Sequence, residues 1–303
     1  MNRGDMEEVK EKGKVCVTGG SGFLGSWMVI RLLQFGYYVN TTIRSHPDRK
    51  KDLSYITNLP GFNTAIEGCI GVFHVAHPVD FENKESEETI SQRSINGTLG
   101  ILQACLNSKT VKCVVYTSSS TTVIVENSSD IVDENSWTNV DIVRALKNFA
   151  SSYTISKTLT EKAALEFAEI NGIDLVTVIP TWIHGSFITP QIPGSVRSSM
   201  EMTLGHQNYN MSYPPYVPFV HVDDVTNAHI FLLENPNAKG RYICSAVEIT
   251  REKLAEYTWA SSEEVTCPRF SSKKLLETGF KYKHGLEEMY DGAIECCKQR
   301  SIL

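Results

Sequence analysis

The stretch VCVTGGSGFLGSW, residues 15–27, decides the fold of this chain. An apolar run of β-forming residues leads into three glycines, Gly19, Gly22 and Gly25, and a helical pattern follows at once. Glycines at a tight strand-to-helix turn let the backbone approach a pyrophosphate, whose charge is met by free amides and the positive end of the helix dipole. A glycine-rich turn without a ligand is the alternative. The context favours a dinucleotide site bordered by Gly19, Gly22, Phe23, Leu24 and Gly25.

The rest of the first 180 residues repeats this alternation of strand and helix. The β-rich runs YYVNTTIR, GVFHVAH, KCVVYTSSS and IDLVTVIP are separated by helical patterns. Such alternation predicts a parallel sheet with crossover helices, and apolar runs indicate strands covered on both faces. We predict an α/β, Rossmann-type doubly wound parallel sheet in residues 1–180. Residues 181–303 are predicted to form mainly a smaller, mixed substrate lobe, from which a strand and a helix at about 216–234 return to the core.

Composition narrows the classes of ligand and location. The net charge is −6 with both signs interspersed, so we expect neither nucleic acid nor membrane insertion, and a small molecule is the expected ligand. Eight cysteines without a CxxC spacing, and no histidines at metal spacing, predict reduced thiols and no metal site. The charged N-terminus lacks an apolar signal core, which predicts a cytoplasmic protein. None of these features bears on the oligomeric state.

A tyrosine and a lysine, Tyr153 and Lys157, lie four residues apart in a predicted helix. Such a pair arises about once by chance in a chain with 12 Tyr and 29 basic residues. Support comes from KCVVYTSSS, a strand that delivers serine hydroxyls to the sheet edge where such folds bind ligands. An ammonium on the same helix face as a phenol lowers the pKa of the phenol, which makes the tyrosine a usable proton donor or acceptor near neutrality. A serine hydroxyl aimed at the same point can hold a carbonyl oxygen.

The end of the second predicted strand indicates which dinucleotide is bound. TTIRSHPDRKK has no acidic residue at the strand tip, and a basic cluster that includes Arg44 and Lys51 follows it. An acid there would bind a ribose diol, whereas a base favours the 2′-phosphate of NADPH. Arg44 is the natural candidate for this phosphate, and a solvated helix start is the alternative explanation of the cluster.

Several motifs together resemble the short-chain dehydrogenase/reductase superfamily, in its extended branch, and within it the plant dihydroflavonol reductase-like group. The likeness covers nearly the whole chain, through VTGGSGFLGSW, VNTTIR, AIEGC, YTSS, YTISKTLTEKAALEFAE, FVHVDDVTNAHIFLLEN, GRYICS and SSKKL. It implies an NADPH-dependent oxidoreductase of plant flavonoid biosynthesis, which passes hydride to an aromatic ketone of the flavonoid or isoflavonoid type.

The resemblance also implies roles for individual residues. Tyr153 would protonate the carbonyl oxygen, and Ser119, the second serine of YTSS, would bind it. Lys157 would hold the nicotinamide ribose and depress the pKa of the tyrosine. The remaining positions implied by the likeness are Arg44 and Lys51 on the 2′-phosphate and Pro180 beside the nicotinamide.

Two segments are shorter than their counterparts in this group. No β-rich run lies between the strand that ends at Arg44 and GVFHVAH, so we expect the third strand of the sheet, at the sheet edge, and a wall of the adenine pocket to be missing there. We therefore expect weaker cofactor binding. The second shortened segment is EYTWASSEEVTCPRF, in the substrate lobe.

Four residues are candidates for contact with the substrate. His77 stands where the group usually has serine or threonine, and a spectator role is favoured because no partner carboxylate can be assigned to it. Ile124 takes the position of a polar substrate contact in dihydroflavonol reductases, which weakens a dihydroflavonol assignment. Trp182 and Phe187 could stack on a flat aromatic substrate, although burial of aromatic residues in a lobe interface needs no ligand.

Two other functions stay open at this point. The shortened segments favour a catalytically silent binding protein, the product of a truncated or alternatively spliced transcript. A sugar-nucleotide epimerase would share the tyrosine and lysine, but that branch usually holds NAD tightly, and the basic residues after VNTTI argue against it.

Overall fold

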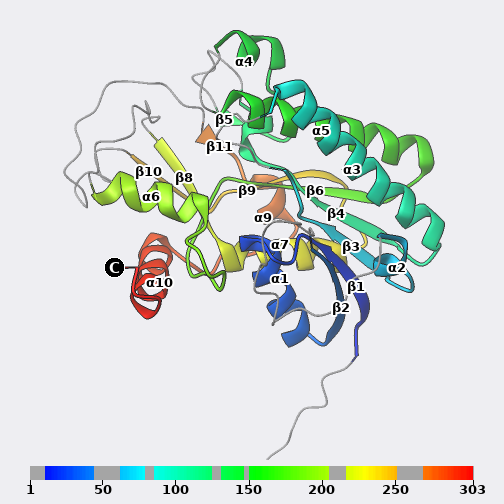
Figure 1. Ribbon diagram of the computed structural model, residues 1–303, viewed down its shortest axis with the longest axis horizontal. Coiled ribbons are helices and arrows are strands. Elements are labelled where there is room, and N and C mark those ends of the chain that lie inside the picture. The colour runs from blue at the N-terminus through cyan, green and yellow to red at the C-terminus, as the bar shows by residue number, and fades with distance from the viewer. Residues whose placement is uncertain are drawn as a thin grey trace, which may run out of the picture.

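The main body of the molecule is a six-stranded sheet in which every strand runs parallel to its neighbours (Figure 1). The computed structural model describes residues 11–43, 62–78, 85–124, 131–146, 150–204, 216–250 and 269–302. Alternate residues of a strand face opposite sides of a sheet, and both sides are apolar here, so both require a covering layer. The strands, in spatial order, are β2 (Tyr37–Thr42), β1 (Gly13–Thr18), β3 (Gly71–His74), β4 (Cys113–Thr117), β6 (Leu175–Pro180) and β9 (Gly240–Cys244).

Helices cover both faces of this sheet, which confirms the predicted doubly wound fold. On one face, α1 (Phe23–Gln34) packs on α7 (Val222–Glu234), and their apolar residues join Val15, Val17 and Val115 in one core cluster. On the other face, Cys16 and Val114 belong to a second cluster. The helices of that face are α2 (Phe62–Ile66), α3 (Glu87–Ser108) and α5 (Ser151–Asn171), with α4 (Val140–Leu146) packed on α5.

Strand β2 is the edge of the described sheet. It pairs with β1 along its whole length, from Tyr37 opposite Gly13 to Thr42 opposite Thr18. No strand among the described residues pairs with its other side. The sequence predicts that no strand forms between Arg44 and β3. Most of that segment, residues 44–61, lies outside the described part of the chain.

The C-terminal third builds a smaller assembly on one side of the sheet (Figure 1). Strand β8 (Tyr216–His221) pairs with β7 (Trp182–His184) in parallel and with β10 (Val247–Thr250) in antiparallel orientation. The helices of this part are α6 (Gly194–Leu204) and α10 (Leu286–Gln299), whereas α9 (Lys273–Glu277) packs on β9 of the main sheet. The remaining short elements are η1 (Ser120–Thr122) and the paired strands β5 (Ile131–Val132) and β11 (Arg269–Phe270).

The return of the chain to the main sheet differs from the prediction in one respect. The helix of residues 216–234 does pack on the sheet, as α7. The strand before it, β8, pairs in the smaller sheet, and β9 is the strand that extends the main sheet beside β6. Sequence pattern alone could not assign these strands because both are short and apolar.

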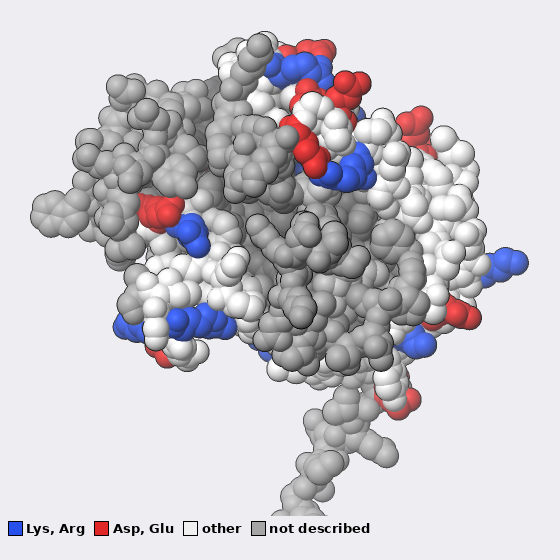
Figure 2. All heavy atoms as spheres, viewed as in Figure 1, with Lys and Arg blue, Asp and Glu red and all other residues white. Residues whose placement is uncertain are grey.

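Charged side chains of both signs lie next to one another on the described surface (Figure 2). On α4, for example, Arg144 pairs with Asp141 in the same helix and with Glu87 of α3. The described cysteines are free, and the described residues contain no cluster of three or more His, Cys, Asp or Glu side chains that could hold a metal. None of the described helices is both long and apolar enough to span a bilayer.

Candidate active site

The glycine loop has the backbone geometry that a phosphate-binding turn requires. Gly19 has a positive φ of 75°, and a Cβ on it would lie 3.1 Å from Ala76. A Cβ on Gly25 would lie 2.2 Å from the carbonyl oxygen of Gly19, so a side chain there would force the turn and α1 apart. Both glycines are therefore required by close approach of backbone segments.

The N-terminus of α1 is open to an anion. Its N-cap is Gly22, no side chain caps it, and its first turn, which begins with Phe23 and Leu24, contains no acidic residue. The first amides of a helix have no partner within the helix, and they carry the positive end of its dipole. These residues fit the pyrophosphate of a dinucleotide, and their contact with a cofactor stays a prediction.

Sequence analysis missed Gly20 in this loop. A Cβ on it would lie 2.1 Å from Oγ1 of Thr41 in β2, and Thr41 in turn donates a hydrogen bond to the carbonyl of Val17. The adjacent glycines Gly19 and Gly20 could have indicated this contact, because each glycine leaves room for a different neighbour, Ala76 and Thr41 respectively.

Ser119 lies directly beyond the carboxyl end of β4, at the start of η1. Its Oγ accepts hydrogen bonds from the backbone N–H and the hydroxyl of Thr121, at 3.3 and 3.1 Å. Its side chain is also hydrogen-bonded with Tyr153 of α5. The structure thus brings together the serine and the tyrosine that the sequence selected from segments 34 residues apart.

Lys157 follows one helical turn after Tyr153 and is almost fully buried, with 3% of its surface exposed. Its Nζ donates a hydrogen bond of 2.9 Å to the carbonyl oxygen of Thr117, the last residue of β4. The same Nζ lies 5.4 Å from the ring centre of Tyr116. The lysine therefore ties α5 to the carboxyl end of β4.

Burial shifts the proton equilibria of both residues. It lowers the pKa of Lys157 to about 7, against the opposing effect of the nearby Glu161 carboxylate. Burial raises the pKa of Tyr153, and the hydrogen bond with Ser119 opposes that rise. The predicted lowering of the Tyr153 pKa by Lys157 is wrong for this structure, because the ammonium is directed at the Thr117 carbonyl rather than at the phenol.

His77 lies against α5, the helix that carries Tyr153 and Lys157. Its ring meets the ring of Tyr153 edge to face, with centroids 5.7 Å apart, and its Nε2 lies 3.4 Å from Oγ of Ser156. The loop that carries His77 is held beside the glycine turn, because Oγ1 of Thr18 accepts hydrogen bonds from the backbone of residues 75 and 76. The structure therefore places His77 in the site, as a packing partner of the tyrosine.

Three other residues predicted for the site, Pro180, Ile124 and Trp182, lie at different distances along the chain from the sheet edge that carries Ser119. Pro180 ends β6 at the same sheet edge as Ser119, and Ile124 follows η1, where it packs on a small cluster with Val123 and Ile179. Trp182 donates its Nε1–H to the carbonyl of Ser195, at the start of α6.

Phe187 is not presented to a substrate, which corrects that prediction. The ring is 1% exposed and packs in a core cluster with residues of α6 and α10. The guanidinium of Arg300 lies 4.9 Å from its centre. Arg44 and Lys51 lie outside the described residues.

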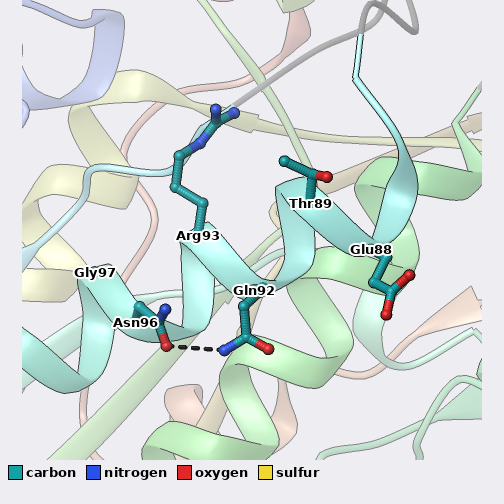
Figure 3. A pocket seen from close by; sticks show the side chains of 6 residues that line it. All are labelled: Glu88, Thr89, Gln92, Arg93, Asn96 and Gly97. Atoms are coloured by element: carbon teal, nitrogen blue, oxygen red, sulfur yellow. Dashed lines mark hydrogen bonds between the residues drawn. The ribbon is translucent and has the colours of Figure 1, made fainter.

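A groove of about 770 Å³ lies along the exposed side of α3 (Figure 3). Gln92 and Asn96 are joined by a hydrogen bond of 2.8 Å on this surface. The groove contains neither the serine, the tyrosine nor the lysine of the site, so it does not define the active site. Its lining residues are Glu88, Thr89, Gln92, Arg93, Asn96 and Gly97.

Comparison with known proteins accounts for this arrangement. The family described as NAD dependent epimerase/dehydratase matches residues 15–244. The chain belongs to the NAD dependent epimerase/dehydratase family. Vestitone reductase of Medicago sativa is 44% identical over 324 residues, which cover 96% of this chain and 99% of that protein. A dihydroflavonol 4-reductase of Callistephus chinensis is 42% identical over 95% of this chain and 87% of its own length.

The crystal structure of vestitone reductase from alfalfa superposes on this chain with a TM-score of 0.83 at 41% sequence identity. The superposition covers 96% of this chain and 100% of the vestitone reductase chain. This member of the NAD dependent epimerase/dehydratase family is an NAD(P)-dependent oxidoreductase. The 324 aligned residues exceed the 303 residues of this chain, so at least 21 residues of vestitone reductase have no counterpart here. That difference agrees with the two shortened segments identified from the sequence.

Proposed function

We propose that this protein is an NADPH-dependent reductase that converts a ketone of the flavonoid or isoflavonoid type to an alcohol. The observation that carries the proposal is the hydrogen-bonded pair of Ser119 and Tyr153, with buried Lys157 one helical turn further along. The substrate class is supported by the names of two relatives that align with nearly the whole chain, vestitone reductase and dihydroflavonol 4-reductase.

Each residue has a defined part in this reaction. When bound, the dinucleotide supplies the hydride. Ser119 donates its hydroxyl hydrogen to the ketone oxygen and orients the carbonyl. Tyr153 delivers a proton to that oxygen, and its raised pKa keeps the proton on the phenol at neutral pH, which suits a donor in the direction of reduction. The Lys157 ammonium would hold the nicotinamide ribose of the bound dinucleotide, and its hydrogen bond to the Thr117 carbonyl fixes it at the sheet edge where Ser119 lies.

Selection of NADPH over NADH rests on the sequence after β2. The strand tip carries no acidic residue that could bind a ribose diol, and Arg44 and Lys51 supply positive charge for a 2′-phosphate. Residues 181–303 are proposed to supply the substrate lobe, in which Trp182 offers apolar surface to an aromatic ketone, and Ile124, which follows η1 of the first domain, is proposed to offer apolar surface beside it.

The first test is Tyr153→Phe, assayed by NADPH oxidation with dihydroquercetin and with an isoflavanone as probes. Turnover should fall at least about 100-fold because the proton donor is gone, while the Kd for NADPH, followed by its fluorescence, should change less than about twofold. Tyr38→Phe is the matched control, since Tyr38 is exposed on β2 and its hydroxyl bonds Glu11. Unchanged turnover in Tyr153→Phe would overturn the proposal.

A catalytically silent binding protein is the second candidate. It is favoured by the residues of vestitone reductase that have no counterpart here. An NADPH titration of the unsubstituted protein separates the two candidates. Micromolar affinity, clearly tighter than for NADH, together with turnover of either probe, supports the reductase. Absence of turnover with every ketone tested supports the silent protein.

A further inference from the structure

A buried ion pair lies directly behind the candidate catalytic residues. Glu161 of α5 has no exposed surface, and Arg241 of β9 is 7% exposed. Nε of Arg241 lies 2.8 Å from Oε1 of Glu161. The two residues are 80 positions apart in the sequence, so the pair fixes the catalytic helix to the outermost strand on that side of the sheet.

The guanidinium of Arg241 has a hydrogen-bond acceptor for each of its five N–H groups. Beyond the contacts with Glu161, one terminal nitrogen donates to the backbone carbonyls of Glu134 and Ser136, at 2.7 and 2.8 Å. The other donates to Oγ1 of Thr122 at 3.2 Å and to Oε2 of Glu161 at 3.5 Å. The ring of Trp137 covers the guanidinium at 3.7 Å. A fully satisfied, planar group of this kind holds its partners in one arrangement.

These partners enclose the segment that carries Ser119. Ser118, the residue before it, donates its hydroxyl hydrogen to Oε2 of Glu161. Thr122, at the end of η1, accepts from Arg241 and donates to the carbonyl of Ser119 at 2.9 Å. The ion pair therefore forms hydrogen bonds with residues on both sides of Ser119, Ser118 before it and Thr122 after it.

Glu161 also faces Lys157, because residues four apart on a helix share one face. Its charge favours the ammonium form of Lys157, against burial. The other titratable neighbours of this lysine and of Tyr153 are His74 of β3, Tyr116 of β4 and His77. The neighbouring helices present their charges outward, where Arg93 pairs with Glu85 and Arg144 with Glu87. Among the described residues, Glu161 is thus the carboxylate that favours the charged form of Lys157, against the larger effect of burial.

We infer that Glu161 and Arg241 are positioning residues of the reductase: their ion pair holds Ser119, Tyr153 and Lys157 in one geometry, and the Glu161 carboxylate supplies a negative charge one helical turn from Lys157. This inference rests on the proposed function for the roles of the three catalytic residues. Neither residue touches the reacting atoms.

The test compares three variants by two readouts. Glu161→Gln removes the charge of the side chain and keeps its shape. Arg241→Lys keeps the positive charge and loses the five hydrogen bonds of the guanidinium. Thr160→Val is the matched control, since Thr160 is a buried neighbour on α5 outside the ion pair.

The first readout is the pH profile of kcat for reduction of dihydroquercetin. The second is the pH profile of urea unfolding for each variant relative to the same variant carrying Lys157→Met, which reports proton binding by Lys157 without any turnover.

In Glu161→Gln, the alkaline decline of kcat should move to lower pH, because the ammonium form has lost its supporting charge. At pH 8 its kcat should be about 10-fold below that of the parent, with the KM for the ketone changed less than about twofold. The Lys157-linked change in stability should move in the same direction. Arg241→Lys should lower kcat without moving the pH of the decline, and Thr160→Val should change neither.

Each outcome decides the inference. It is overturned if Glu161→Gln leaves both pH profiles in place, or if Thr160→Val moves them equally. The two proposals can fail separately. If the parent protein shows no turnover, the reductase function is refuted. If the pH profile of the Lys157-linked stability nevertheless shifts in Glu161→Gln, the coupling between the charges of Glu161 and Lys157 still holds. If Glu161→Gln fails to fold, Ser118→Ala removes one of its hydrogen bonds without changing charge, and it should lower kcat without moving the decline. An unchanged kcat in Ser118→Ala would overturn the positioning role.

Discussion

Two buried cations, Arg241 and Lys157, lie near the same carboxylate, that of Glu161, and differ in how many polar partners each one has. Arg241 has a carboxylate in direct contact, acceptors for all its N–H groups and an aromatic ring over its plane. Lys157 has one carbonyl at hydrogen-bond distance and no carboxylate within ion-pair distance among the described residues. The loss of hydration is compensated in the first case and only partly in the second.

This difference separates a structural charge from a chemical one. A cation that is fully compensated holds its environment rigid, and a guanidinium keeps its proton throughout. A partly compensated ammonium releases its proton near neutrality, as the pKa of about 7 for Lys157 indicates. Residues with labile protons in buried positions are common at catalytic sites, because proton transfer needs a small free-energy difference between the two forms.

The largest expected effect comes from removing the compensated cation. Arg241→Met leaves the Glu161 carboxylate buried without its cation, and the free energy of unfolding should fall by about 3–5 kcal/mol. Urea denaturation followed by circular dichroism measures this change.

The double variant Glu161→Gln with Arg241→Met serves as its control. Once both charges are absent, no buried ion lacks a partner, so the double variant should be more stable than Arg241→Met alone. Strictly additive losses from the two single variants would show that the pair is not coupled.

Removing the partly compensated cation should have the opposite sign. Lys157→Met replaces a costly buried ammonium with an apolar chain of similar length, and the free energy of unfolding at pH 6 should rise by about 1–4 kcal/mol. The unfolded chain binds this proton up to about pH 10.4, whereas the folded protein releases it near pH 7. The stability of the parent therefore rises with pH across this interval, and the advantage of the variant should shrink from pH 7 towards pH 10.

Lys162→Met provides the comparison for that experiment. Lys162 lies on the same helix but is exposed, with its Nζ 5.1 Å from the ring centre of Trp137. Its substitution should change stability by less than about 0.5 kcal/mol at either pH. A gain that stays constant between pH 6 and pH 10 in Lys157→Met would contradict the low pKa assigned to that lysine.

The contrast between the two cations also marks what sequence could predict. The glycine turn, the alternation of strands and helices and the pairing of Tyr153 with Lys157 are local patterns, and each was confirmed as a structural element. Ser119 could be placed with them because parallel strands end at one edge. The proton affinity of Tyr153 could not be predicted, since it depends on which acceptor the Lys157 ammonium finds, and that acceptor belongs to β4.

Distant pairings were beyond sequence pattern for a related reason. Glu161 and Arg241 are each unremarkable in their own segments, and only the packing of α5 against β9 brings them together. The same applies to β8, whose partners β7 and β10 come from separate segments, and to Phe187, whose burial depends on α6 and α10. Such features are set by tertiary contacts, which a single sequence does not reveal.

The smallest expected effect tests whether burial, rather than ion pairing itself, gives the Arg241 contact its strength. Arg93 and Glu85 form an ion pair of 2.6 Å, and their side chains are 48% and 40% exposed. Water solvates both charges before and after the pair is broken, so Arg93→Met should lower the free energy of unfolding by less than about 0.5 kcal/mol. Added salt should abolish even that loss, because exposed charges are screened, whereas the loss in Arg241→Met should persist at 0.5 M NaCl, where the screening length is about 4 Å. Equal losses from the same Arg-to-Met change at the two positions would show that desolvation does not distinguish them.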